Sequence, residues 1–138
     1  MLTISPEVNL YLKKTIIAVL GTISENGRPH LVPMWFNWED GKAYMFTTRT
    51  TAKWRNLQVR PYGSLCVDLK TPPYSAVMIS GTITEAEKSV YEVVKSCAFR
   101  YYDENRASKF VNRYKGNPPK SVAFQLIPET ISIFNALT

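Results

Sequence analysis

Several short apolar runs rich in β-branched and aromatic residues, of which 29–38 alternates with a period of two, predict a protein built mainly from β-strands. The Asn26-Gly27 pair is the strongest short-range signal for a β-hairpin, and residues 39–42 (Glu-Asp-Gly-Lys) predict a second one. The first three expected strands therefore form an antiparallel meander. The expected strands cover residues 15–24, 29–38, 43–48, 64–69, 75–85 and 122–127 with 130–134, the last being one strand or a bent pair interrupted at Pro128.

The period changes to that of a helix in three places. Residues 3–14 begin with Ser5 as a helix cap and Pro6 at the first helical position, which predicts a short helix closing one end of the sheet. A second short helix is expected to begin at Thr50 or Thr51, and residues 86–115 predict one or two helices. Gly81, inside an expected strand, predicts a bulge or a close approach of two backbones.

Five or six short antiparallel strands, joined mainly by hairpins, predict a small β-barrel with peripheral helices rather than a sandwich or an alternating β/α fold. Both faces of the strand at 29–38 carry large apolar residues. This indicates a closed barrel that also packs against another surface, such as a second subunit. A length of 138 residues suits one domain, covering residues 1–138.

Composition limits the partners and the compartment. The net charge of +6 favours acidic ligands, namely phosphates, polyanionic cofactors or nucleic acid. Cys66 and Cys97 lie in different expected elements without metal-ligand or disulfide spacing, so we expect two buried thiols and no metal. No signal peptide is evident and no apolar run approaches the roughly 18 residues that span a bilayer, so a cytoplasmic protein is expected.

Hydroxyl and cationic side chains gather where the strand at 43–48 gives way to the second helix. Thr50 or Thr51 can cap this helix, which would leave first-turn N–H groups and the positive dipole end available to a phosphate. Residues 49–60 contain no carboxylate and four cations, namely Arg49, Lys53, Arg55 and Arg60. We predict an anion site there, although the plain alternative is a set of solvated surface charges. The cluster comprises Thr47, Thr48, Arg49, Thr50, Thr51, Lys53 in the first helical turn, and Asn56 one turn later.

His30 is the one histidine of the chain, so the sequence offers no Ser/His/Asp or Cys/His arrangement for a hydrolase. We interpret His30 as a structural residue at a strand start, with substrate contact as the alternative. The tryptophans are interpreted first as core or interface residues.

Taken together, these motifs resemble the pyridoxamine 5′-phosphate oxidase-like superfamily of split-barrel flavin and deazaflavin oxidoreductases. The resemblance implies a six-stranded, Greek-key-like split barrel that forms a homodimer, with FMN or the deazaflavin coenzyme F420 bound at the subunit interface. It is carried by residues 27–36 (GRPHLVPMWF), 47–57, 61–68 (PYGSLCVD), 79–82 (ISGT) and 127–129 (IPE).

The resemblance also implies roles for individual residues. Lys53, with Thr47, Thr48 and Arg49, is similar to the phosphate clamp of the family, and Ala52 and Asn56 belong to the same cofactor-binding segment. The strand along the ring system is identified with Val32, Pro33, Met34 and Trp35, of which Trp35 is the preferred ring contact. The partner subunit is expected to contribute residues from the region 77–80.

The function implied is hydride transfer to or from a small organic substrate. The coenzyme ring carries this chemistry, so the absence of an acid–base triad is compatible with it. The C-terminal arginine and histidine motif of the founding oxidase is not identified here, so vitamin B6 oxidase activity is not implied. The alternatives are a flavin or haem carrier without turnover and a basic single-strand nucleic-acid module. The choice between FMN and F420 stays open.

Overall fold

The structure is a computed structural model, and it describes residues 2–137. Its elements, in chain order, are α1 (Pro6–Leu12), β1 (Ala18–Ile23), β2 (Pro29–Met34), β3 (Asn37–Glu39), β4 (Lys42–Thr48), α2 (Ala52–Val59), β5 (Tyr62–Asp68), β6 (Ala76–Glu85), α3 (Val90–Tyr101), α4 (Glu104–Asn112) and β7 (Ser121–Phe134).

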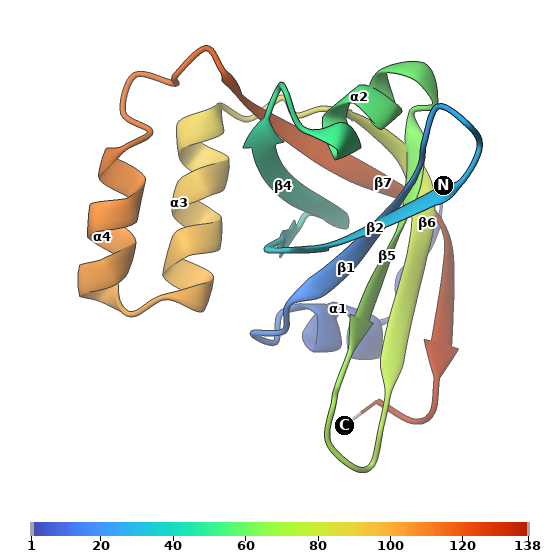
Figure 1. The fold of residues 1–138 in the computed structure, drawn as a ribbon. Helices are drawn as coiled ribbons and strands as arrows, with labels where there is room; N and C mark the ends of the chain where they lie inside the picture. Colours follow the sequence, from blue (N-terminus) through green and yellow to red (C-terminus); the bar gives the residue numbers. More distant parts are fainter. Residues whose placement is uncertain (1, 138) are drawn as a thin grey trace.

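The strands form one antiparallel sheet in the order β2-β1-β5-β6-β7-β4-β3. Figure 1 shows that this sheet curls into a half-barrel, with α1 and α2 at its two ends and the α3–α4 hairpin beside it. The predicted mainly β split barrel with peripheral helices is confirmed, as is the role of α1 in closing one end. The strand count differs, because the structure has seven strands and the sequence predicted six.

The extra strand arises because the expected strand at 29–38 is two strands. β2 pairs with β1, whereas β3 pairs with β4, so the predicted three-strand meander is wrong. The chain bends between β2 and β3 because Phe36 turns inward and is fully buried. The Tyr101 hydroxyl on α3 stabilises this bend, since it lies 3.4 Å from the backbone nitrogen of Phe36 and 3.2 Å from its carbonyl oxygen.

Both predicted hairpin turns are present. Gly27 has φ +83°, and Asp40 and Gly41 have φ 53° and 69°, a left-handed pair typical of tight turns between antiparallel strands. Pro29 and Pro33 are tolerated in β2 because β2 is an edge strand of the sheet.

Of the two alternatives predicted for the end of the chain, the structure has the single strand. β7 runs through Pro128 and pairs with β4 over residues 121–126 and with β6 over residues 124–134. The register shifts between Ser80 and Gly81, where Glu129 is the unpaired extra residue of a β-bulge. The bulge and close approach predicted at Gly81 are confirmed, because a Cβ atom there would lie 1.9 Å from the carbonyl oxygen of Ile127.

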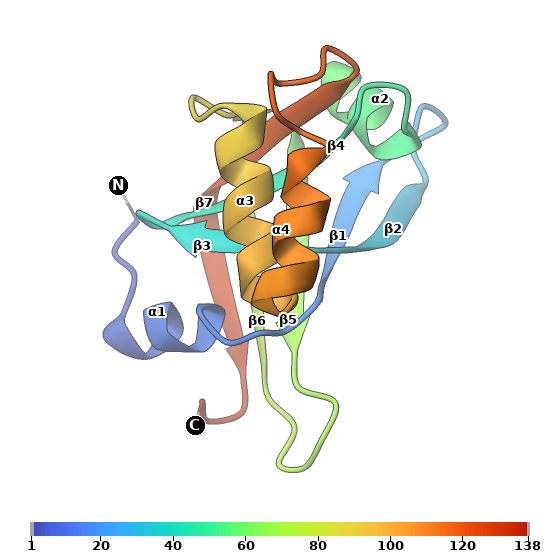
Figure 2. The ribbon, with the colours of Figure 1, turned by 90° about the vertical axis from the view of Figure 1, so that its left-hand side faces the viewer.

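The main core fills the concave side of the sheet, where the largest fully buried side chains include Tyr11, Phe36 and Phe124. A second apolar layer lies between β4 and the α3–α4 hairpin, which Figure 2 shows in front of the sheet. Of the two cysteines, Cys97 is buried as predicted, whereas Cys66 is only partly buried.

Candidate functional site

Three side chains at the junction of β4 and α2 form a compact polar group, which we name the clamp cluster: Thr47, Thr51 and Lys53. The Lys53 ammonium donates a hydrogen bond to the Thr47 hydroxyl at 3.2 Å. The Thr47 and Thr51 hydroxyl oxygens lie 3.1 Å apart. The sequence placed these groups together because one strand end, one turn and one helical turn span only seven residues.

The start of α2 leaves backbone donors without a side-chain partner. Thr51 occupies the N-cap position, but its hydroxyl makes no capping bond and instead contacts Thr47 and the carbonyl oxygen of Thr48. The amides of the first turn therefore have no side-chain acceptor. The positive end of the α2 dipole also lies at this first turn.

Lys53 is half-buried, and burial lowers its pKa below the ordinary lysine value. Within residues 2–137, no carboxylate lies within salt-bridge distance of its ammonium. A cation that is partly removed from water and lacks a counter-charge gains stability from any anion that reaches it. The clamp cluster is therefore chemically suited to a phosphate.

The side chains of Arg49 and Thr48 make no recorded contact with the clamp cluster among residues 2–137. The Arg49 guanidinium donates to the carbonyl oxygen of Pro119 at 3.3 Å and lies 3.5 Å from the carboxylate of Glu85. Thr48 is exposed. Of the residues predicted for the phosphate clamp, Lys53 and Thr47 are thus in direct contact, while Arg49 is engaged elsewhere.

The four residues predicted to lie along the coenzyme ring, 32–35, have different surroundings. Met34 is buried in the main core, Val32 packs against that core, and Pro33 is exposed. Trp35, just after β2, joins the aromatic layer beneath α3 and α4, where it stacks on Tyr101 with ring centroids 5.4 Å apart. One face of this indole is thus already covered.

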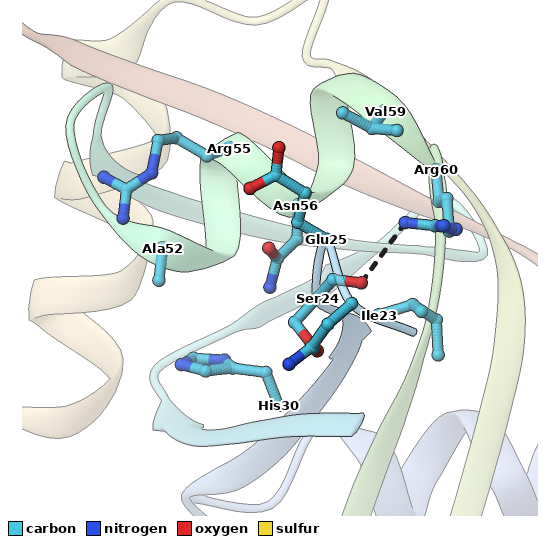
Figure 3. A pocket seen from close by; sticks show the side chains of 10 residues that line it. Ile23, Ser24, Glu25, His30, Ala52, Arg55, Asn56, Val59 and Arg60 are labelled. Carbon is cyan, nitrogen blue, oxygen red and sulfur yellow. Dashed lines mark hydrogen bonds between the residues drawn. The ribbon is translucent and has the colours of Figure 1, made fainter. Parts of the chain in front are cut away.

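A hollow lies between α2 and the β1–β2 hairpin, as Figure 3 shows. We name it the hairpin hollow; its volume is about 720 Å³. Asn56 lies at its edge and donates to the buried Thr22 hydroxyl at 3.0 Å, which ties α2 to β1. The hairpin hollow is lined by residues 23–26 and His30 on the hairpin, and by Ala52, Arg55, Asn56, Val59 and Arg60 on the helix side.

Sequence reasoning counted Arg55 and Arg60 among the cations of the segment but did not place them in a shared hollow with His30. The spacing of residues 52, 55, 56 and 59 could have identified one helical face. No sequence signal shows that this face lies opposite the β1–β2 hairpin, because that depends on how α2 packs on the sheet. Trp54 and Leu57 fix this packing, since both are buried in the main core.

No helix within residues 2–137 is both long and apolar enough to cross a membrane. The same range contains no group of three His, Cys, Asp or Glu residues placed to hold a metal ion.

Comparison with known proteins gives a family match and a set of structural neighbours. The family described as pyridoxamine 5′-phosphate oxidase matches residues 4–134. No curated protein matches the sequence. A conserved hypothetical protein from Mycobacterium tuberculosis is similar in structure, with TM-score 0.78, 20% identity, and coverage of 98% of this chain and 86% of that one.

Two further neighbours differ in what their names say they bind. A structure named F420 reductase has TM-score 0.64 and 22% identity, with coverage of 90% of this chain and 94% of that one. A haem-binding protein from Mycobacterium smegmatis has TM-score 0.72 and 12% identity, with coverage of 97% of this chain and 55% of that one. At these identities the neighbours show a shared fold.

Proposed function

This chain belongs to the family described as pyridoxamine 5′-phosphate oxidase, and from that premise we propose that it is an oxidoreductase that binds FMN or coenzyme F420. In this proposal the phosphate of the coenzyme sits at the clamp cluster, and hydride passes between the coenzyme ring and a small organic substrate. The neighbour named F420 reductase supports the deazaflavin option.

The observation that carries the proposal is the contact between the Lys53 ammonium and the Thr47 hydroxyl at 3.2 Å, in a half-buried position without a carboxylate partner among residues 2–137. The donor set fits a phosphate group. It combines one cation, two hydroxyls and first-turn amides of α2, and it brings no negative charge with it.

The chain's own residues would bind and orient the coenzyme, while the ring supplies hydride chemistry when bound. The clamp cluster is rigid because α2 is anchored in the core by Trp54, whose ring centroid lies 5.8 Å from that of Phe124. A rigid anchor at the phosphate fixes where the other end of the molecule can lie. The strand Val32 to Trp35 is proposed to run along the ring, and the aromatic layer beside Trp35 would exclude water there.

We propose that the protein acts as a homodimer with coenzyme sites at the interface. Large apolar side chains are exposed on the convex side of the sheet, and Leu31 on β2 and Tyr62 on β5 have exposed fractions of 69% and 54%. Within the region 77–80, Met78 and Ser80 are only partly buried, whereas Val77 and Ile79 point into the core. A partner contribution from this region would therefore come through Met78 and Ser80.

The test is a titration of the purified protein with FMN and with F420, followed by fluorescence or calorimetry. We expect one of the two to bind at micromolar concentration. Replacing Lys53 by Gln should weaken this binding by about 1.5 to 3 kcal/mol, the scale of a hydrogen bond to a charged group. Lys95→Gln on the exposed face of α3 removes the same charge far along the chain and should leave affinity unchanged.

If neither coenzyme binds, or if Lys53→Gln and Lys95→Gln behave alike, the proposed phosphate site is wrong. An absorbance spectrum of the freshly purified protein adds an independent readout. A flavin or deazaflavin band supports the proposal, whereas a haem Soret band would favour a carrier function.

A further inference from the structure

The helix α4 and the loop that follows it carry a concentrated positive charge that no role proposed so far uses. Residues 105–120 contain five cations and no carboxylate, so this segment has a formal charge of +5 in a chain whose net charge is +6. All five cationic residues are exposed, and none of them forms a salt bridge within residues 2–137. We name this set the α4 cation surface; it comprises Arg106, Lys109, Arg113, Lys115 and Lys120.

Three of these cations form one row along α4. Arg106, Lys109 and Arg113 are three and four residues apart, so they share one face of the helix over about 10 Å of its length. The buried face of the helix consists of Ala107 and Val111, which belong to the apolar cluster shared with α3. Figure 1 shows α4 on the outer side of α3, away from the sheet. The row of cations therefore lies on a protruding, convex part of the molecule.

Two guanidinium groups of this row are held over aromatic rings. The Arg106 guanidinium lies 5.4 Å from the ring centroid of Tyr102, and the Arg113 guanidinium lies 5.7 Å from that of Phe110. Both rings pack against Trp35 in the aromatic layer, so their own positions are fixed. A cation–π contact orients a guanidinium but leaves its five N–H donors without acceptors. The two arginines are therefore positioned in advance for an oxyanion.

The character of the surface distinguishes between classes of anionic partner. Within residues 104–120 no large apolar side chain is exposed, whereas protein interfaces have apolar and aromatic centres and membrane-surface helices insert an apolar face into lipid. An unpaired nucleic-acid strand needs free aromatic rings on which its bases stack, but Tyr102 and Phe110 are already packed in the aromatic layer. A protruding basic helix instead matches the grooves and closely spaced phosphates of a duplex.

We propose that the α4 cation surface docks on the phosphate backbone of a DNA duplex. Contacts to phosphate position a protein on the duplex but carry no sequence information, so the binding is independent of base sequence. The inference does not depend on coenzyme binding, because the α4 cation surface shares no residue with the clamp cluster. It also leaves the proposed homodimer surface free, since Leu31 and Tyr62 lie on β2 and β5.

The experiment is a fluorescence-anisotropy titration of a labelled DNA duplex of about 20 base pairs with the full chain, at sodium chloride concentrations from about 50 to 200 mM. We expect a dissociation constant of about 1 to 100 μM, the range of non-specific duplex binding. The logarithm of the affinity should fall against the logarithm of salt concentration with a slope of about −3 to −5, which corresponds to about three to five neutralised phosphates. A second duplex of unrelated sequence should bind equally well.

Charge-matched double variants locate the contact. Lys109→Gln combined with Arg113→Gln should weaken duplex binding by about tenfold or more at about 0.1 M salt, and should make the slope shallower by about two. Lys13→Gln combined with Arg28→Gln removes the same charges from exposed positions at the end of α1 and on the β1–β2 hairpin. This control should change the affinity by less than about twofold, because salt screens charges that lie away from the contact.

A second double variant guards against an effect on folding. Lys115→Gln combined with Lys120→Gln lies outside α4, so it cannot weaken the helix, and it should also reduce duplex affinity and the salt slope. Circular dichroism verifies that each variant is folded. Absence of duplex binding at the lowest salt concentration would overturn the inference, as would equal losses for the α4 variant and its control. Tighter binding to a single strand of the same sequence, or binding to phosphatidylserine vesicles without binding to the duplex, would also overturn it.

Discussion

Gly81 marks the closest approach of two strands in the sheet, and replacing it by Ala should destabilise the fold strongly. The new Cβ would lie 1.9 Å from the carbonyl oxygen of Ile127, whereas real Cβ atoms essentially never come closer than 3.0 Å. The opposing atom is backbone, so relief requires β6 and β7 to separate by roughly 1 Å at the bulge. Separation on that scale weakens neighbouring ladder hydrogen bonds as well.

We expect Gly81→Ala to lower the free energy of unfolding by about 3 kcal/mol, the upper part of the usual overpacking range. Urea denaturation followed by tryptophan fluorescence measures this directly. Gly21→Ala is the matched control. Its Cβ would meet the end of the flexible, exposed Leu31 side chain at 3.2 Å, and alanine also suits a strand better than glycine. A change within about 1 kcal/mol is expected there.

Similar losses for Gly81→Ala and Gly21→Ala would refute this reasoning, because the close backbone contact at Gly81 would then not determine the loss of stability. An unchanged stability for Gly81→Ala would show that the strands do not approach as the structure describes.

Three further predictions concern other parts of the structure. Arg100→Met should lower the free energy of unfolding by about 2 kcal/mol, because Arg100 donates to two backbone carbonyls at the end of α1, and Arg100→Lys should recover part of this in the same urea assay. Cys97 should resist thiol reagents at pH 8 in the folded protein, since burial raises its pKa to about 12, while the partly buried Cys66 reacts; modification of both thiols at equal rates would contradict this. Coenzyme affinity should fall as pH rises, because Lys53 must carry its proton to attract phosphate. Since burial lowers the pKa of Lys53, this fall should begin at a pH below the ordinary lysine pKa of about 10.4. Lys53→Arg, whose charge persists, should retain affinity over that range, and parallel curves for the two proteins would contradict the reasoning.

Much of the fold follows from local signals in the sequence. The Asn26-Gly27 turn, the capped start of α1 and the helical spacing after residue 90 each arise within a few residues, so periodicity and turn chemistry identify them. The division of the expected 29–38 strand into β2 and β3 does not follow from local signals. It depends on Phe36 turning into the core and on Tyr101 satisfying the backbone there, and these residues lie 65 positions apart.

The candidate site also has parts that local sequence predicts and parts that depend on distant segments. Thr47, Thr51 and Lys53 lie close in sequence, so their proximity could be predicted. The engagement of Arg49 by Glu85 and Pro119 could not, since both partners come from distant segments. The hairpin hollow required the same long-range information, because it forms only when α2 packs across β1.

A crystal structure of the protein with FMN or F420 bound tests the central claim most directly. The account predicts that the phosphate lies within hydrogen-bond distance of the Lys53 ammonium and the Thr47 hydroxyl, at the first turn of α2. A phosphate bound elsewhere on the barrel, with Lys53 still donating to Thr47 alone, would contradict it.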